Sequence, residues 1–468
     1  MPPASTETED QPPATRVRIV VSAWLAIMAA HAYLCRSSIG VIATPIRLDL
    51  GLTEAQMGLI LGPAFFWTYA LAQIPASRLG ERLGARISLP CFACAWSIAT
   101  MLFGAVTIAT ILPGTVIWFP LLMGIWMVTG LAQAGAFPVA TRTIAVWYPR
   151  TERVLASGSL AALMSVGAAI GAGLTGMLIE RVSWQALFAI YAVPGILWAV
   201  GFHWWFRNRP EEHPTVNDAE RRHIREDELE STAVPTNRDP TPWLSLATSW
   251  PMWMICGQQY CRAAAQVFFV SWFTTFLHES RHITLAKSGL LSVLPNLSIA
   301  VACLIGGGVA DAVYRRTGRL DWSRKGLAVA SLTLSTILIF AAYFVKDATP
   351  AVIVISAGIF CAGLAGPSAY AVTMDMGGRH VGAVFATMNM VGNLGAGALP
   401  VLIPIFRTWV KSTPMLLNAC AGDTWNAVVV LIAFLHLAAA VCWVLLPLRG
   451  TVFDHSWITS DEKYQLPG

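Results

Sequence analysis

Long apolar blocks recur along the whole chain, with short polar segments between them. Each block holds about 20 to 28 residues, enough to cross a hydrocarbon layer of about 30 Å as a tilted helix. We count twelve blocks, six before and six after one longer polar stretch. They lie near residues 18–46, 55–79, 87–109, 114–141, 152–180, 184–206, 250–277, 286–313, 326–345, 350–374, 380–406 and 425–448. The pattern predicts an all-α integral membrane protein whose twelve transmembrane helices form two six-helix bundles.

The polar segments divide the chain into five expected regions. They are an N-terminal tail (1–17), an N-terminal six-helix bundle (18–206), a linker (207–249), a C-terminal six-helix bundle (250–448) and a C-terminal tail (449–468). The first tail is polar and acidic, unlike the basic and then apolar start of a cleavable signal peptide. We therefore expect the first apolar block to remain as a membrane helix.

The linker is the only long charged segment of the sequence. Asn217 and Asp218, followed by AERRHIRED, predict the start of a short surface helix within it. Two interpretations stay open. We favour a solvated tether between the bundles, and the alternative is a regulatory contact.

Composition strengthens the membrane assignment and excludes several functions. Hydrophobic residues make up 56% of the chain and charged residues 12%, whereas soluble domains carry roughly a quarter charged residues. The lipid bilayer is the expected surrounding, and nucleic acid is not an expected partner. The nine cysteines show no disulfide framework, and the lone Cys91–Cys94 pair lacks further ligands, so we expect no metal site and no cofactor. The spans show no catalytic set of an intramembrane enzyme, and we expect a monomer.

The distribution of Lys and Arg predicts the orientation. If both termini are cytoplasmic, the cytoplasmic segments carry 22 of the 31 Lys and Arg residues and the opposite side carries 7. The other two, Arg36 and Arg262, lie within spans. Because short cytoplasmic loops collect positive charge, we expect a multi-pass protein of the inner (plasma) membrane of the cell, with both termini in the cytoplasm.

The two predicted bundles share a short motif after their second helix. In the first it reads SRLGERLGAR from Ser77, and in the second GGVAD from Gly307, followed by Arg315 and Arg316. Each copy has an acid four positions after a small residue and then a basic cluster. This repeat resembles the signature between helices 2 and 3, repeated between helices 8 and 9, of the major facilitator superfamily. The resemblance implies the fold of that superfamily and says nothing about the substrate.

The resemblance also implies a gating role for the motif. In the superfamily the acid and arginines brace neighbouring helices on the cytoplasmic face and help to lock the outward-open state. Ser77 and Glu81 depart from the usual glycine and aspartate, but they preserve small size and charge. Carried over, the gating role falls on Ser77, Glu81, Arg82, Gly84, Arg86, Gly307, Asp311 and Arg315.

Two cations inside predicted spans are the first candidates for function, because a charge within a bilayer is costly. Arg36 lies in HAYLCRSSIG of the first span and Arg262 in GQQYCRAAAQ of the seventh, and no acid stands in the middle of any span. Gln259 and Gln266 share a helix face with Arg262, and Tyr33 shares one with Arg36. Two cations facing one cavity would attract anions. A structural arginine bonded to backbone carbonyls is the alternative for each.

Neutral polar and aromatic residues at helical spacing would complete such a cavity. They are Trp67, Tyr69 and Gln73 in the second span, Trp126, Thr129 and Gln133 in the fourth, Asn296 in the eighth, and Asn389 and Asn393 in the eleventh. A carbohydrate-like ligand needs neutral donors and acceptors together with aromatic faces, and this set fits it. Since Asn and Gln also bridge membrane helices structurally, we expect about half of the set to line the pathway.

Within the superfamily the chain most resembles the anion:cation symporters, a group with sialin-like, phthalate, hexuronate and galactonate transporters. The resembling segments are YLCR (33–36), AQIP (72–75), GLAQAGAFPVATRTIAVWYPRTER (130–153), RPEEHP (209–214) and MNMVGNLGAG (388–397). The resemblance implies that Tyr33 and Arg36 hold the substrate anion, that Tyr69 and Gln73 line the cavity, and that Asn389 or Asn393 binds a polyol. Our substrate-binding set also includes Gln133, Gln259 and Arg262.

Three positions depart from the pattern of that group, and one of them is Trp126, where some members have an arginine in the fourth helix. Many of its members have an acid directly before the arginine of the first helix, where this chain has Cys35, and a glutamate in the fourth helix, where it has Gln133. Proton coupling through a membrane carboxylate is therefore in doubt. The remaining titratable candidates are the substrate itself and His31, since the unperturbed pKa of histidine is about 6.5.

The sequence thus predicts a secondary transporter of a small organic anion, such as a sugar acid or another carboxylate, that works by alternating access. A proton or another cation is the expected coupling ion if transport is coupled. The alternative is an organophosphate:phosphate antiporter, because arginines in the first and seventh helices also resemble the pair that clamps phosphate in that group. A non-transporting membrane sensor on the same fold is the third interpretation.

Overall fold

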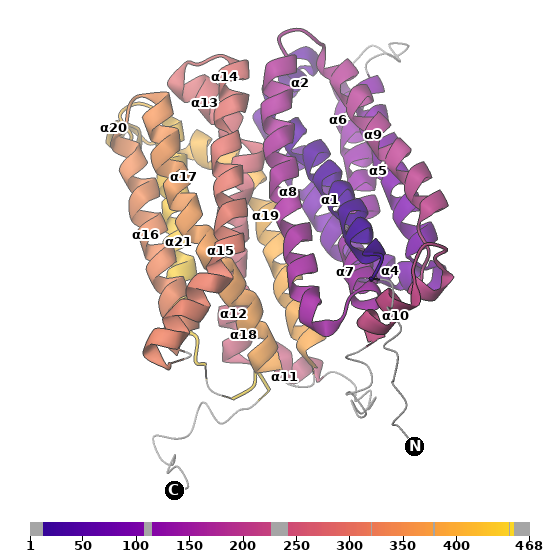
Figure 1. The fold of residues 1–468 in the computed structure, drawn as a ribbon. Coiled ribbons are helices and arrows are strands. Elements are labelled where there is room, and N and C mark those ends of the chain that lie inside the picture. Colours follow the sequence, from indigo (N-terminus) through magenta and orange to yellow (C-terminus); the bar gives the residue numbers. More distant parts are fainter. Residues whose placement is uncertain are drawn as a thin grey trace, which may run out of the picture.

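The computed structural model describes residues 13–106, 115–225, 242–319, 321–377, 380–448 and 450–453. Every regular element within these ranges is helical, and the long helices stand side by side in two groups (Figure 1). The chain enters α1 and leaves α21 at the same end of the molecule, which we call the terminal end. We call the opposite end, where α2, α13, α14 and α20 lie, the distal end.

The first half of the chain supplies six long helical segments, several of them bent or interrupted. They are α1 (Val17–Val41) with α2 (Ala43–Leu50); α3 (Glu54–Leu59), η1 (Ile60–Ala64) and α4 (Phe65–Leu83); α5 (Ala85–Ala105); α6 (Thr115–Ala134) with α7 (Ala136–Trp147); α8 (Arg150–Leu178); and α9 (Trp184–Trp205). Gly84 separates α4 from α5 with φ +74°, a backbone angle that glycine adopts without a steric penalty.

The second half repeats the arrangement. Its segments are α12 (Trp250–Ser271) with α13 (Phe273–Arg281); α14 (Leu285–Leu291) with α15 (Val293–Thr317); η3 (Trp322–Gly326), α16 (Leu327–Ala341) and η4 (Ala342–Phe344); α17 (Ala348–Leu364) with α18 (Gly366–Gly377); α19 (Val381–Ser412); and α20 (Pro414–Ala419) before α21 (Thr424–Leu445). The two short helices between the halves, besides η2 (Pro210–Glu212), are α10 (Asp218–Arg225) and α11 (Trp243–Thr248).

Within the described residues, eleven helical segments are long and apolar enough to cross a membrane. The remaining long helix, α12, falls short of that criterion because it carries Gln258, Gln259, Arg262 and Gln266 among its apolar residues. It packs against α19 and α21 inside the second half. We count it as the twelfth span, in agreement with the sequence pattern.

The outer surface suits a lipid environment. Large apolar side chains such as Leu71 (72% exposed), Leu197 (66%) and Phe434 (61%) face outward from the middle of their helices, and a surface of this kind marks a membrane contact rather than a soluble exterior. Exposed Trp204 and Trp253 lie near helix ends, where tryptophan favours the membrane interface.

Helix α8 links the two halves through close backbone contacts. A Cβ atom on Gly167 would lie 2.1 Å from the carbonyl oxygen of Ala30 in α1, and one on Gly176 would lie 2.8 Å from the Cα of Gly289 in α14. Any larger side chain would force these helices apart. The glycines of α8 therefore allow close packing against α1 of the same half and against α14 of the other half.

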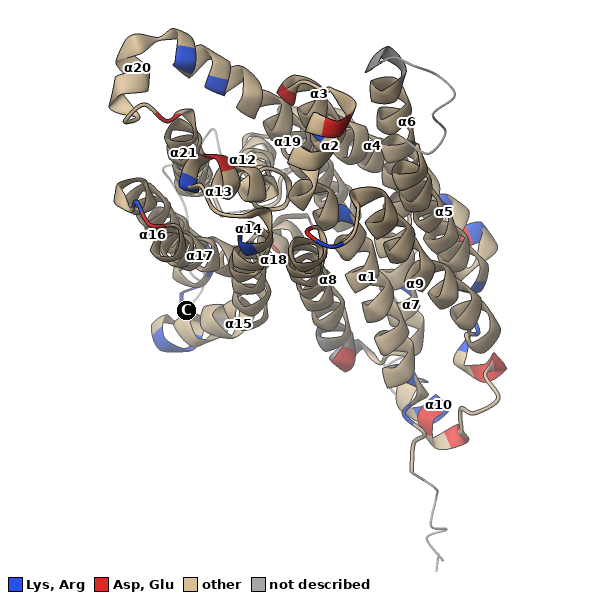
Figure 2. Ribbon diagram, turned by 90° about the horizontal axis from the view of Figure 1, so that it is seen from above, with Lys and Arg blue, Asp and Glu red and all other residues tan. Residues whose placement is uncertain are grey.

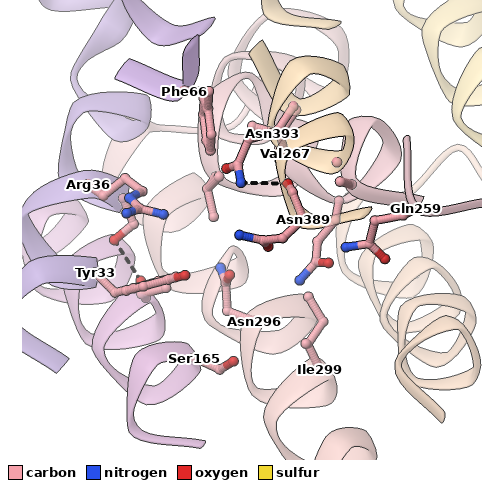
Figure 3. Close-up of a pocket in the computed structure, with 17 residues that line it drawn as sticks. Tyr33, Arg36, Phe66, Ser165, Gln259, Val267, Asn296, Ile299, Asn389 and Asn393 are labelled. Carbon is pink, nitrogen blue, oxygen red and sulfur yellow. Dashed lines mark hydrogen bonds between the residues drawn. The ribbon is translucent and has the colours of Figure 1, made fainter. Parts of the chain in front are cut away.

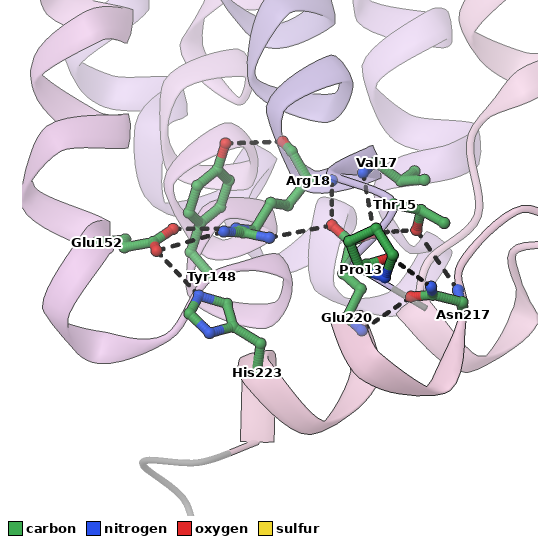
Figure 4. A network of polar contacts seen from close by, with 9 residues as sticks. All are labelled: Pro13, Thr15, Val17, Arg18, Tyr148, Glu152, Asn217, Glu220 and His223. Carbon is green, nitrogen blue, oxygen red and sulfur yellow. Dashed lines mark hydrogen bonds and ion pairs between the residues drawn. The ribbon is translucent and has the colours of Figure 1, made fainter. Parts of the chain in front are cut away.

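The linker is docked to the first half at the terminal end (Figure 4). Asn217 caps α10, as predicted, because its Oδ1 accepts a hydrogen bond from the backbone N–H of Glu220 at 3.0 Å. Glu220 is fully buried. Its carboxylate accepts hydrogen bonds from the backbone N–H groups of Val17 and Arg18, each at 3.0 Å, and from the Thr15 hydroxyl. A carboxylate at the start of α1 satisfies donors that a helix N-terminus leaves free.

A second acid extends this docking to α8. Glu152 accepts a hydrogen bond from Arg18 Nε at 3.0 Å and lies 2.9 Å from His223 Nε2 of α10. The Tyr148 hydroxyl donates to the backbone oxygen of Arg18 at 2.7 Å. The interpretation of the linker as a solvated tether is therefore wrong for its described part up to Arg225, which is held on α1 and α8.

Candidate functional site

A pocket lies between the halves, lined by side chains of both (Figure 3). Side chains of α1, α4, α8, α12, α15 and α19 line it. Of the described residues around it, only Arg36 is charged. Its other polar lining residues are Tyr33, Ser37, Ser165, Gln259, Gln266, Asn296, Asn389 and Asn393.

Arg36 is held by aromatic rings instead of an acid. The centre of its guanidinium group lies 4.2 Å from the ring centre of Phe65 and 4.4 Å from that of Tyr33, with Tyr69 at 5.5 Å and Phe66 at 5.8 Å. A cation over an aromatic face is stabilised by roughly 0.5 to 2 kcal/mol, more when water is excluded. Arg36 forms no ion pair with any described carboxylate, so its charge remains uncompensated.

Gln133 fixes one side of the guanidinium group. Arg36 Nη2 donates to Gln133 Oε1 at 3.0 Å, and Gln133 Nε2 donates to the backbone oxygen of Ala32 at 3.3 Å. Gln133 is only 2% exposed. Because a guanidinium group can only donate, the amide oxygen of Gln133 must face Arg36 and its nitrogen must face the backbone oxygen of Ala32. Arg36 Nε has no partner within the described structure. Arg36 Nη1 forms no described hydrogen bond and is not among the buried unpaired atoms, so the guanidinium group keeps a donor for an anion, although Nε itself is buried.

The predicted residues of the first half come together around Arg36. Tyr33, Arg36, Tyr69 and Gln133 line a second, much smaller pocket next to the first. Gln73 lines neither pocket. It contacts the site indirectly, because Asn389 Nδ2 of the other half donates to Gln73 Oε1 at 3.1 Å.

The second half presents amides to the pocket. Asn393 Nδ2 donates to the backbone oxygen of Asn389 at 2.9 Å, which leaves the Asn393 side-chain oxygen without a described partner (Figure 3). Gln259 and Asn296 line the same space. Amides both donate and accept, so this wall can bind hydroxyl groups or an acid oxygen.

Arg262 does not line either pocket. Its Nη2 donates to Gln259 Oε1 at 2.8 Å, so it lies behind the amide wall and orients Gln259 with the amide nitrogen free. Like Arg36, it forms no ion pair with any described carboxylate, and its Nε lacks a partner. The structure therefore places Arg262 outside the pocket lining and against the lining residue Gln259, and its predicted contact with a ligand stays a prediction.

His31 lies outside the pocket and is fully engaged. Trp96 Nε1, which can only donate, lies 3.2 Å from His31 Nδ1, and His31 Nε2 lies 2.8 Å from the backbone oxygen of Tyr191. Nδ1 must therefore accept and Nε2 must carry the hydrogen, which is the neutral tautomer. Protonating Nδ1 would break the bond to Trp96. The geometry argues against His31 as a proton carrier.

Sequence reasoning missed part of the lining. Phe66 and Ser165 line the pocket, yet each resembles an ordinary residue of an apolar helix. Asn296 was among the neutral residues expected to complete the cavity and Gln266 shared the helix face of Arg262, but neither was included in the substrate-binding set. Their position at a helical face was the available signal, and both line the pocket.

The predicted gating motif lies at the terminal end, and its described contacts stay within one half. Arg142 of α7 pairs with Glu81 at 3.2 Å, with both side chains more than half exposed. Arg86 Nε donates to the backbone oxygen of His203 in α9 at 3.2 Å. No described ion pair across the halves involves the exposed Arg82 or Arg315, and Ser77 and Gly307 carry no charge. The side chain of Asp311 lies outside the described residues.

Four charges close the distal end across the halves. Arg47 of α2 binds Glu54 of α3 at 3.0 Å and Glu279 of α13 at 3.2 Å, and Arg407 of α19 binds the same two acids at 2.8 and 3.3 Å. Positive and negative groups thus alternate around a ring, which we call the distal ring. Sequence analysis did not identify it.

The described polar contacts between the halves lie at the level of the pocket or nearer the distal end. They are Gln73–Asn389, Trp67–Leu394, Thr44–Thr275 and the distal ring. The described residues nearer the terminal end form ion pairs within one half, such as Glu81–Arg142 and Asp375–Arg324. The structure is therefore closed at the distal end.

Comparison with known proteins extends this description. The sequence profile of the Major Facilitator Superfamily matches residues 25–400. The probable sulfoacetate transporter SauU of Cupriavidus necator is 27% identical, over 86% of this chain and 91% of its own. The probable galactarate/D-glucarate transporter GudP of Bacillus subtilis is also 27% identical, over 94% and 96%. The D-galactonate transporter of Escherichia coli O6:H1 is 27% identical, over 83% and 89%.

Solved structures agree on the fold. A bacterial homologue of the human lysosomal transporter Spinster, in an inward-facing and occupied conformation, superposes with a TM-score of 0.69 at 18% identity, over 92% of this chain and 96% of that one. The xylose transporter XylE from E. coli, in an inward-open conformation, gives a TM-score of 0.68 at 12% identity, over the same shares. The predicted fold class is confirmed.

Proposed function

The chain belongs to the Major Facilitator Superfamily, and from that premise we propose that it is a secondary transporter of a small organic anion, working by alternating access in the inner membrane. It is a transporter and not an enzyme. The observation that carries the proposal is Arg36, an uncompensated cation at a pocket between two helical halves. A carboxylate or sulfonate would supply the missing negative charge and accept from the free donors of the guanidinium group.

A sugar acid or another short acid is the substrate class that the lining supports best. Asn389, Asn393, Asn296 and Gln259 offer amide groups opposite Arg36, and such groups can bind hydroxyls along a short chain. The three relatives named above are a probable sulfoacetate transporter, a probable galactarate/D-glucarate transporter and a D-galactonate transporter. Each of these compounds has an acidic group on a small, polar body.

The organophosphate:phosphate alternative is less well supported. It needs two arginines that clamp one phosphate, whereas Arg262 lies behind Gln259 and outside both pockets. A single lining arginine suits one acidic group, with amides for the rest of the ligand.

Orientation and boundaries belong to the same proposal. Both termini lie in the cytoplasm, so the terminal end faces the cytoplasm and the distal ring faces outward. The pocket is then closed to the outside. The halves are residues 18–206 and 250–448, joined by the cytoplasmic linker 207–249 and flanked by short cytoplasmic tails, and the protein acts as a monomer.

A thermal-shift screen tests the substrate class. Purified protein is heated with sulfoacetate, galactarate, D-glucarate, D-galactonate, glycerol 3-phosphate or inorganic phosphate, and with uncharged galactitol as the control. A ligand that binds only the folded state raises the unfolding temperature. At a ligand concentration one hundred times its Kd, the free energy of unfolding increases by about 2.7 kcal/mol. We expect stabilisation by at least one of the first four acids and none by galactitol, and no shift with Arg36→Gln. Stabilisation by the two phosphates alone would favour the alternative.

A further inference from the structure

The empty pocket keeps a positive charge that the protein does not neutralise. No Asp or Glu is among the described residues that line either pocket. The groups around Arg36 are neutral: four aromatic rings and the amide of Gln133. Arg262, behind the amide wall, also lacks a described acid. The charge at the site is therefore balanced only when an anion is bound.

Alternating access makes this imbalance costly at one step. To change sides, a carrier must pass through a state in which both ends are closed. The distal ring already closes one end, and closing the terminal end would remove Arg36 from bulk water. An unpaired ion in such surroundings is strongly destabilised, while a paired and hydrogen-bonded one is tolerated. The barrier to crossing is thus high for the empty carrier and low for the loaded one.

A proton cannot take over this role. Protonation adds positive charge to the pocket unless it neutralises an acid, and no acid is among the described lining residues. His31, the histidine of the first helix, binds Trp96 and Tyr191 through its two ring nitrogens and lies 3.6 Å from Cys35 Sγ.

We propose that the protein is an obligatory anion exchanger. One anion enters from one side only when another leaves from the other, and both use the site at Arg36 in turn. The exchanged partner is a second small anion bearing a carboxylate, sulfonate or phosphate group. This inference rests on the proposed function, because it requires that a small organic anion be transported.

Efflux from liposomes tests the proposal. Vesicles containing the purified protein are loaded with radiolabelled D-glucarate or radiolabelled sulfoacetate and diluted into buffer with or without a saturating amount of the same unlabelled anion outside. Potassium and valinomycin clamp the voltage, so that charge build-up does not slow net efflux. We expect label to leave at least about tenfold faster when the anion is present outside.

The two ways of failing are distinguishable. Equal efflux in both conditions would show transport without exchange and would overturn the inference while the proposed function stands. No efflux of either anion in either condition would remove the proposed function for these two substrates and the inference with it.

Gln133→Glu provides a second, independent test. The new carboxylate would lie at the position of Gln133 Oε1, 3.0 Å from Arg36 Nη2, and would neutralise the empty pocket. We expect the ratio of exchange to net efflux to fall toward one. The matched control is Gln185→Glu in the first turn of α9, outside both pockets, which should keep the wild-type ratio. An active Gln133→Glu protein with an unchanged ratio would contradict the inference, and if that variant does not fold, the wild-type comparison decides.

Discussion

Arg36 illustrates how a single residue can hold a charge inside a helical bundle without an acid beside it. The rings of Tyr33, Phe65, Phe66 and Tyr69 surround it, and Gln133 accepts one of its hydrogen bonds. Removing one member of a buried ion pair normally strands the other. Here no carboxylate would be stranded, so function and stability should separate at this position.

The first prediction is that Arg36→Ala abolishes uptake and changes stability little. Arg36→Lys should recover at most about a tenth of the wild-type rate, because an ammonium group is a point charge and lacks the planar fork that binds an acid group bidentately. Uptake of labelled anion by proteoliposomes that hold the unlabelled anion, and the unfolding temperature, are measured on the same preparations. Undiminished transport by Arg36→Ala would refute the assignment of the site.

The second prediction concerns His31, whose role is expected to be structural. His31→Ala would leave the buried Trp96 N–H without its partner, at a cost of about 1 to 3 kcal/mol. His31→Gln is the matched variant, because an amide can accept from Trp96 and donate to Tyr191. We expect lower thermal stability for alanine, partial recovery for glutamine, and transport by the glutamine variant that resembles wild type.

The same proteins give the test of proton coupling. Uptake is measured with an imposed pH gradient between about pH 5.5 and 8, the range in which an ordinary histidine titrates. We expect weak dependence on the gradient for wild type and for His31→Gln. Strong gradient-driven accumulation that His31→Gln abolishes would show that His31 carries the proton.

At the scale of elements, α10 depends on the charge of Glu220. Burial opposes that charge, but hydrogen bonds from Thr15 and from the backbone N–H groups of Arg18 and Val17 outweigh it and lower the pKa of Glu220 below its ordinary value of 4.5. A lowered pKa stabilises the folded form above the ordinary value, and the contribution is lost as the pH falls through the folded pKa. Docking of α10 should therefore be intact at neutral pH and weaken below about pH 4.5.

The third prediction is that Glu220→Gln loosens this docking at neutral pH. Hydrogen bonds to a charged acceptor contribute about 1.5 to 3 kcal/mol, and those to a neutral one less. Hydrogen exchange at the backbone amides of Val17 and Arg18 should accelerate about tenfold. Glu212→Gln, at an exposed position of the same linker, is the control and should leave these amides protected. Equal protection in all three proteins would mean that the charge of Glu220 contributes nothing.

The sequence predicted elements better than it predicted the contacts between them. Apolar block length located the spans, and helical spacing placed Tyr33 and Arg36 on one face, where they line the pocket together. It could not find the distal ring, because Arg407 and Glu54 are 353 positions apart and look like ordinary loop charges until the halves are assembled. Arg262 shows that the helix face of a residue does not determine which group its side chain contacts. Its helix face was read correctly, but its side chain turns to Gln259 instead of the pocket.

At the scale of the whole molecule, the distal ring should set the balance between the two ends. Arg407 binds Glu54 and Glu279, and its guanidinium group lies 3.9 Å from the ring centre of Trp425. The fourth prediction is that Arg407→Ala shifts the population toward an open distal end, because both acids lose a shared partner while Arg47 alone still links them. Neutralising Lys411, an exposed cation on the same helix, should have no such effect.

Distances between spin labels measure that shift. Labels on exposed Thr53 of the first half and exposed Met415 of the second report the width of the distal end. The Arg407→Ala distribution should gain a longer component that wild type and Lys411→Ala lack. An unchanged distribution would show that close backbone contacts, such as the one between Gly58 and Pro400, close this end without help from the ring.

The docked linker also determines where the polypeptide can be cut in two. A gene divided after Arg225 would encode a first fragment that keeps Glu220 over the start of α1, where it accepts from Val17 and Arg18. Division after Arg207 would move α10 to the other fragment, and the start of α1 would then depend on a segment that must find it by collision. We expect co-expressed fragments of the first kind to assemble into an active carrier more efficiently than fragments of the second kind.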